Sequence, residues 1–87
     1  MHVFEASKET LEGIEYTIVR GSDVDRDGMY LQLSEKESEK IIAEIFYSDR
    51  THDVSLSCFR PDIPLALIES LIDDAKQLLP PISRENG

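Results

Sequence analysis

The hydrophobic pattern changes its period once along the 87-residue chain, and this change most constrains the fold. Over residues 13–59, apolar side chains recur at every second position, which is typical of strands with one buried face. Over residues 62–79 they recur at every third or fourth position, which is typical of an amphipathic helix. We therefore predict one α+β domain over residues 1–81, in which the strands precede the helix.

Polar intervals rich in Asp, Ser and Gly separate the alternating runs, so neighbouring strands are expected to pair antiparallel through hairpins. Val3 and Phe4 indicate a further edge strand, whereas the segment from Ser7 to Glu12 is too polar to assign. The predicted architecture is a four- to five-stranded antiparallel meander sheet with one C-terminal amphipathic helix packed on one face. The predicted strands span about residues 2–7, 13–21, 28–34, 39–48 and 52–59.

The helix is predicted over about residues 62–79. Asp62 is the expected N-terminal cap, because its carboxylate can accept the unpaired amide protons, and Pro64 suits a first turn. Pro80 and Pro81 are expected to end the helix, and residues 82–87 are expected to form a flexible tail.

The alternation also assigns side chains to the two faces of the sheet. The face away from the helix is expected to carry polar residues mixed with four larger apolar ones, Val19, Ile42, Phe46 and Phe59. These four either form a contact patch for a partner or for a second copy of the chain, or they cover one another or lie under the N-terminal segment. The residues expected on the covered face are Ile14, Tyr16, Ile18, Met29, Leu31, Leu33, Ile41, Ala43, Ile45, Tyr47, Val54, Leu56 and Cys58.

The charge balance is strongly acidic, with 18 Asp and Glu against 9 Lys and Arg and a net charge of −9. Nucleic-acid binding requires clustered basic residues, so no nucleic-acid partner is expected. The charge either keeps the chain soluble or steers a basic protein partner. The lone Cys58 allows no intrachain disulfide, and no apolar stretch is long enough for a membrane span, so a cytoplasmic location is predicted.

The sharpest motif is Asp23-Val-Asp25-Arg-Asp27-Gly28, which resembles the first six positions of an EF-hand calcium loop. The twelfth position is Ser34, where that family requires a bidentate Glu, so the resemblance ends within the loop. A calcium site using the three aspartates is therefore an alternative. Against it stands an ordinary hairpin turn in which Asp27-Gly28 supplies a positive φ.

No pattern of residues predicts catalysis. His52 and Cys58 are expected on one strand, where six residues separate them by about 20 Å at about 3.3 Å per residue, too far for a nucleophile and its base. Cys58 also falls on the apolar side of that strand and is expected in the core. No enzyme activity and no resident cofactor are predicted.

The leading hypothesis is a small acidic, non-catalytic protein-binding module. An inhibitor or immunity-type partner of a basic protein is one concrete form. The alternatives are a calcium-binding domain, or a homodimer in which Ile42, Phe46 and Phe59 or an exposed edge strand pair two copies. Aromatic residues of the uncovered face would anchor the partner, and acidic residues would raise the association rate. The predicted contact residues are Glu15, Tyr30, Ile42, Glu44, Phe46 and Phe59.

Overall fold

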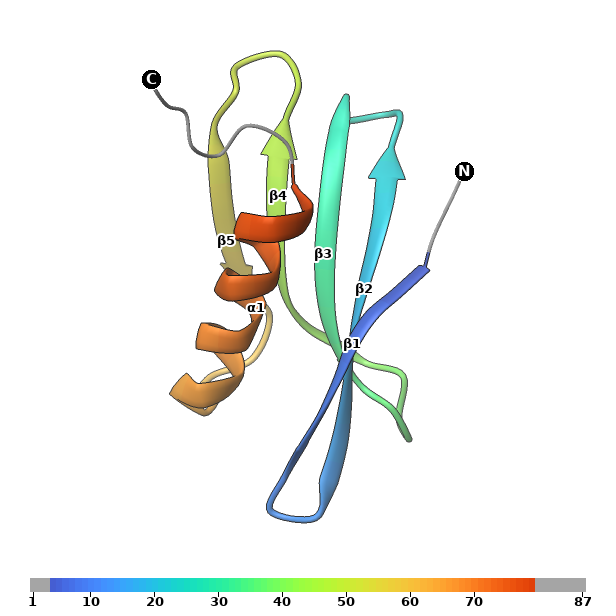
Figure 1. Ribbon diagram of the computed structural model, residues 1–87, viewed down its shortest axis with the longest axis vertical. Helices are drawn as coiled ribbons and strands as arrows, with labels where there is room; N and C mark the ends of the chain where they lie inside the picture. Colours follow the sequence, from blue (N-terminus) through green and yellow to red (C-terminus); the bar gives the residue numbers. More distant parts are fainter. Residues whose placement is uncertain (1–3, 80–87) are drawn as a thin grey trace.

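The computed structural model describes residues 4–79 of the chain, and it has five strands followed by one helix (Figure 1). The predicted flexible tail, the helix-ending Pro80 and Pro81, and residues 2–3 of the predicted first strand, with Val3, lie outside the described residues. The elements are β1 (Phe4–Leu11), β2 (Ile14–Asp23), β3 (Gly28–Glu35), β4 (Ile41–Ser48), β5 (Val54–Cys58) and α1 (Leu65–Leu78).

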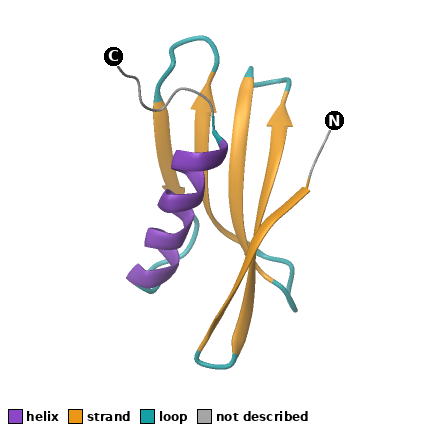
Figure 2. Ribbon diagram, viewed as in Figure 1, coloured by secondary structure: helices purple, strands orange, loops and turns teal. Residues whose placement is uncertain are grey.

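The five strands form one open sheet in the order β1-β2-β3-β4-β5, and each pairs antiparallel with the next. Helix α1 lies on one face of this sheet (Figure 2). It contacts β1, β3 and β4. The predicted α+β meander with one helix on one face is therefore confirmed. We call the face under α1 the helix face and the opposite one the outer face.

Residues with positive φ make the first two hairpin turns. Glu12 and Gly13, with φ of 52° and 81°, join β1 to β2, as a two-residue turn of the twist-compatible type requires. Between β2 and β3, Asp27 has a φ of 53°, so the aspartate-rich segment is a hairpin turn. A side chain at Gly28 would collide with the Tyr47 carbonyl and the Phe46 ring, so glycine is needed there for close approach.

The core lies between α1 and the three middle strands, where alternate residues are fully buried. Ile18 of β2, Leu31 and Leu33 of β3 and Leu71 of α1 have no exposed surface. Burying such a side chain contributes about 1.5–3 kcal/mol. The core residues are Tyr16, Ile18, Leu31, Leu33, Ile42, Ala43, Ile45, Tyr47, Leu67, Leu71, Ala75 and Leu79.

A bulge overturns the predicted orientations at the start of β4. The register between β3 and β4 shifts after Leu33, because Leu33 pairs with Ala43 and Ser34 pairs with Ile41. The extra residue, Ile42, is buried in the core, whereas Ile41 is 42% exposed. The prediction that Ile42 lies on the uncovered face is therefore wrong. Ile14, which was expected in the core, is 46% exposed at the first hairpin turn.

The ends of two elements also differ from the prediction. The helix begins at Leu65, its N-cap residue is Pro64, and no side chain caps it. Asp62 has a φ of 59° and precedes the helix, so its expected capping role is wrong. Strand β1 continues to Leu11 through the polar segment that the sequence pattern does not assign. The hydroxyl of Ser7 donates to Asp74 of α1 at 2.6 Å.

Candidate functional site

Strand β5 is the most exposed strand of the sheet. All five of its residues are exposed, including Val54 and Leu56 at 41% and 46%. By pairing, Leu56 lies beside Ile45 and Val54 beside Tyr47, and both of these β4 residues are buried. The apolar residues of β5 therefore lie on the helix face, but the helix leaves them uncovered.

A shallow groove separates α1 from β5 on the helix face. It has a volume of about 200 Å³, and Lys76 is its one charged lining residue among those that the structure describes. Ile72, which α1 contributes to this groove, is 38% exposed. The groove and the adjacent strand thus form a continuous apolar surface. The lining residues are Ile45, Val54, Ser55, Leu56, Ile72, Ala75 and Lys76.

Among residues 4–79, no other strand pairs with the backbone of β5 on the side away from β4. The amide of Phe59 donates to the carbonyl of Ile42 at 2.8 Å, and the amide of Ser48 donates to the carbonyl of Asp53 at 3.0 Å. Odd-numbered residues therefore direct their backbone groups at β4, and even-numbered residues direct theirs away from it, because the direction alternates along a strand. The outward groups belong to Val54, Leu56 and Cys58, at the end of the sheet order.

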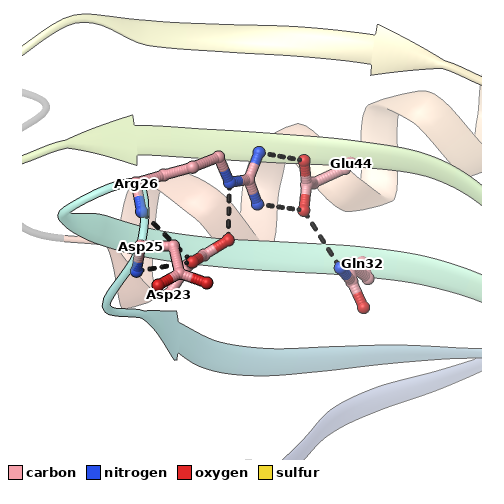
Figure 3. A network of polar contacts seen from close by, with 5 residues as sticks. All are labelled: Asp23, Asp25, Arg26, Gln32 and Glu44. Carbon is pink, nitrogen blue, oxygen red and sulfur yellow. Dashed lines mark hydrogen bonds and ion pairs between the residues drawn. The ribbon is translucent and has the colours of Figure 1, made fainter.

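The outer face carries a compact polar cluster over β3 and β4 (Figure 3). The guanidinium of Arg26 makes two hydrogen bonds to the carboxylate of Glu44, at 3.0 and 3.1 Å, and one to Asp23 at 2.6 Å. Gln32 donates to Glu44 at 3.0 Å. The same guanidinium lies 4.1 Å from the centre of the Phe46 ring, so Arg26 covers both a carboxylate and an aromatic side chain.

The electrostatics of this cluster favour charged side chains. Burial disfavours ionisation of Glu44, which is 5% exposed, but the hydrogen bonds from Arg26 and Gln32 outweigh it and lower the pKa of Glu44. Hydrogen bonds to Glu44 and Asp23 raise the pKa of Arg26. The hydrogen bond from Arg26 likewise lowers the pKa of Asp23. The cluster is therefore an ion-pair network that satisfies its own charges.

The structure does not bring the six predicted contact residues into one patch. Ile42 and Glu44 are buried, and Phe46 lies under Arg26. Tyr30 is half-buried against Gly21, where a side chain would collide with its ring. Glu15 is exposed and lies 3.6 Å from the Lys36 ammonium. Of the six, Phe59 follows β5 directly and is 57% exposed.

The three aspartates of the predicted calcium loop do not converge. Asp23 accepts hydrogen bonds from the amides of Asp25 and Arg26, at 3.0 and 3.2 Å, besides the Arg26 side chain. Its carboxylate therefore closes the turn and neutralises an arginine. Among residues 4–79, no three acidic, histidine or cysteine side chains are grouped as metal ligands.

His52 and Cys58 occupy different surroundings from those predicted. His52 precedes β5, has a φ of 64°, and its Nδ1 is hydrogen-bonded to the Tyr47 hydroxyl at 2.8 Å. Cys58 is exposed, so the expectation of a core cysteine is wrong. The reason is the position of α1, which covers the β4 partner of Cys58 but not Cys58 itself.

A second depression, of about 320 Å³, lies between the first hairpin and the β3–β4 connection, and Glu15, Glu35 and Glu37 line it. Glu35 accepts hydrogen bonds from Arg60 and Ser38, which lower its pKa. Two of the carboxylates that line this depression are therefore ion-pair partners: Glu15 pairs with Lys36, and Glu35 pairs with Arg60.

Two features of the structure were not located from the sequence, although pairing through an exposed edge strand was among the alternatives. The Arg26–Glu44 contact joins residues 18 positions apart, and only the register of the β2–β3–β4 meander brings them together. The sequence does contain a signal for the open edge of β5: its five residues, VSLSC, carry no charge, although 31% of the residues in the chain are charged.

No helix of the described residues has the length and apolar character to cross a bilayer. Comparisons with protein-family models, with curated protein sequences and with solved structures find no match to this chain.

Proposed function

We propose that this chain is a non-catalytic protein-binding module that docks its partner along β5. The proposal rests on one observation: β5 is an uncharged edge strand with every residue exposed and its apolar side chains uncovered on the helix face. An exposed edge of this kind presents unpaired amide and carbonyl groups that another strand can pair with.

The apolar groove beside β5 supports the same surface. A strand added to β5 would place alternate side chains on the helix face, next to Leu56 and Ile72. Backbone hydrogen bonds would supply affinity, and the groove would select the side chains. The outer face has less apolar and charged surface left for a partner, because Arg26 already covers Phe46 and pairs with Glu44.

The net charge of −9 would act at longer range. It raises the association rate of a basic protein and lowers that of an acidic one, in both cases by an amount that salt reduces. An inhibitor or immunity-type partner of a basic protein is the form of this function that best uses both the charge and the open edge.

The test compares Leu56→Lys with Ile14→Lys. Both wild-type residues are 46% exposed, so the two substitutions are matched in chemistry and exposure, but Ile14 lies at the first hairpin turn, away from β5. Proteins retained by the purified wild-type chain from its native cell extract are identified, and their binding is then measured with purified components. We expect Leu56→Lys to abolish this binding and Ile14→Lys to preserve it; equal binding by both variants refutes the proposal.

A further inference from the structure

We propose that β5 pairs with the β5 strand of a second copy of this chain, antiparallel and about a two-fold axis at Leu56. This inference rests on the proposed function, because it uses the same strand edge, and it names a second copy, in place of a basic protein, as the occupant of that edge.

The first argument is the symmetry of the strand. β5 is Val-Ser-Leu-Ser-Cys, a near-palindrome centred on Leu56. In an antiparallel pair centred there, Leu56 lies opposite Leu56 of the partner subunit. Each small apolar residue then faces a small apolar residue, and each serine faces a serine, which can exchange hydrogen bonds across the strands. A two-fold interface requires this self-complementarity.

The second argument is the direction of the backbone groups. The three even-numbered residues of β5 direct their amides and carbonyls away from β4. In the proposed register each even residue faces an even residue of the other copy, so every outward group of the strand meets a complementary group. The central Leu56 pair and the two flanking pairs are therefore all hydrogen-bonded pairs, and the sheet continues from one copy into the next.

The third argument concerns charge. Two copies that each carry −9 repel one another, so self-association requires an interface that brings no acidic side chains together. β5 has no charged residue, and Lys76 is the one charged side chain among the described residues that line its groove.

The interface is small. A five-residue strand on each side buries less than the roughly 1,600 Å² of a standard protein interface, so we expect a dissociation constant of about micromolar or weaker. Salt should strengthen this dimer, because it screens the repulsion between acidic copies. Complexes with a basic protein should respond in the opposite direction.

The first experiment is analytical ultracentrifugation of the full chain at rising protein concentration, in low and in high salt. The proposal predicts a monomer–dimer equilibrium that shifts toward dimer in high salt. It also predicts that Leu56→Lys lowers the association constant about tenfold or more, whereas Ile14→Lys leaves it unchanged. Circular dichroism checks that both variants are folded. A wild-type chain that stays monomeric at millimolar concentration overturns the proposal.

The second experiment tests the register by disulfide formation. In a background of Cys58→Ser, Leu56→Cys places two thiols in facing positions, where the Cα atoms of a hydrogen-bonded pair lie about 5.5 Å apart, within disulfide reach. In the same background, Val54→Cys places them four residues apart along the strands, about 13 Å at about 3.3 Å per residue, beyond reach. We expect rapid dimer cross-linking of the first variant and none of the second. Equal cross-linking of both overturns the register.

The two proposals fail in different ways. If the wild-type chain is monomeric but Leu56→Lys abolishes binding of a different protein, the second-copy inference is wrong and the binding function stands. If the chain dimerises and Leu56→Lys prevents it, the inference is supported. If the chain is monomeric and neither lysine variant affects partner binding, both proposals are wrong.

Discussion

The two edge strands of the sheet, β1 and β5, differ in the features that keep an edge from pairing with another chain. β1 carries Glu5, Lys8 and Glu9, has a bulge between Glu5 and Ser7, and is tied to α1 by the Ser7–Asp74 hydrogen bond. β5 has no charge and no register shift in its pairing with β4, and all five of its residues are exposed, whereas several residues of β1 are half-buried. Charges and bulges prevent an edge from pairing with another chain, so β1 has the features of an edge that stays single and β5 lacks them.

This difference shows that the alternation of apolar side chains along a strand does not determine whether the helix covers them. β4 and β5 pair residue by residue, and both place apolar side chains on the helix face, yet those of β4 are buried and those of β5 are exposed. The alternation along a strand indicates only which side of that strand is apolar. Whether the apolar side chains are buried depends on the position of the helix, which the sequence of a single strand does not determine.

The largest expected effect separates covered from uncovered leucines. Leu71→Ala removes a side chain with no exposed surface, so we expect a loss of about 3–4 kcal/mol in the free energy of unfolding. Leu56→Ala removes one that is 46% exposed, and we expect a loss below about 1 kcal/mol. Urea unfolding of the dilute monomer measures both. Similar losses for the two variants would show that Leu56 is covered after all.

The second-largest expected loss of stability comes from removing Arg26, the cation that pairs with buried Glu44, and it is compared with removal of an exposed cation on the edge strand β1. Arg26→Ala leaves the buried Glu44 carboxylate with Gln32 alone, but Arg26 itself is 44% exposed, so we expect a loss of about 1–2 kcal/mol rather than that of a fully buried pair. Lys8→Ala breaks an exposed pair with Glu5 at 3.7 Å on β1 and is the matched control, with an expected loss below about 0.5 kcal/mol.

The loss in Arg26→Ala should also depend on pH. In the wild type the pKa of Glu44 is lowered from 4.5, so its stabilising contribution is present above pH 4.5 and is lost as the pH falls further. Without Arg26, burial acts unopposed by that cation and favours the protonated form. The stability difference between the two chains should therefore narrow on acidification below pH 4.5. A constant difference across that range would contradict the assignment to Glu44.

The smallest expected change in stability comes from removing two charges of β1. The double substitution Glu5→Thr and Lys8→Thr removes two exposed charges, and we expect unfolding to change by less than about 0.5 kcal/mol. Made in a Leu56→Lys background, which closes the β5 edge, these changes should create self-association through β1 that the Leu56→Lys chain lacks. Sedimentation at matched concentration measures it. A chain that stays monomeric would show that the remaining features of β1, namely the bulge, Glu9 and the Ser7–Asp74 hydrogen bond, are enough to keep β1 unpaired.

Much of the fold could be predicted because the local pattern and the final packing agree. The alternation of Tyr16, Ile18, Leu31 and Leu33 predicted one buried face, and all four are core residues. The three- and four-residue spacing likewise predicted α1, with Leu67, Leu71 and Ala75 on its buried side. Such residues have the same role in any sheet that a helix covers.

The missed features depend on tertiary structure. β1 extends through polar residues because pairing with β2, rather than its own composition, holds it in the sheet. Ile41 and Ile42 exchange their expected environments because one bulge reverses the alternation. The candidate site was predicted on the outer face, since nothing in the sequence states that Arg26 covers Phe46 or that α1 stops short of β5.

The order of elements along the chain has a consequence for biosynthesis. All five strands precede α1, which supplies Leu67, Leu71 and Ala75 to the core and holds β1 through Asp74. As the polypeptide leaves the ribosome, the strands emerge with their apolar face unshielded until residues 65–78 follow. Apolar surface exposed in this way favours aggregation, so a chain that terminates before the helix is expected to aggregate more readily than the full chain.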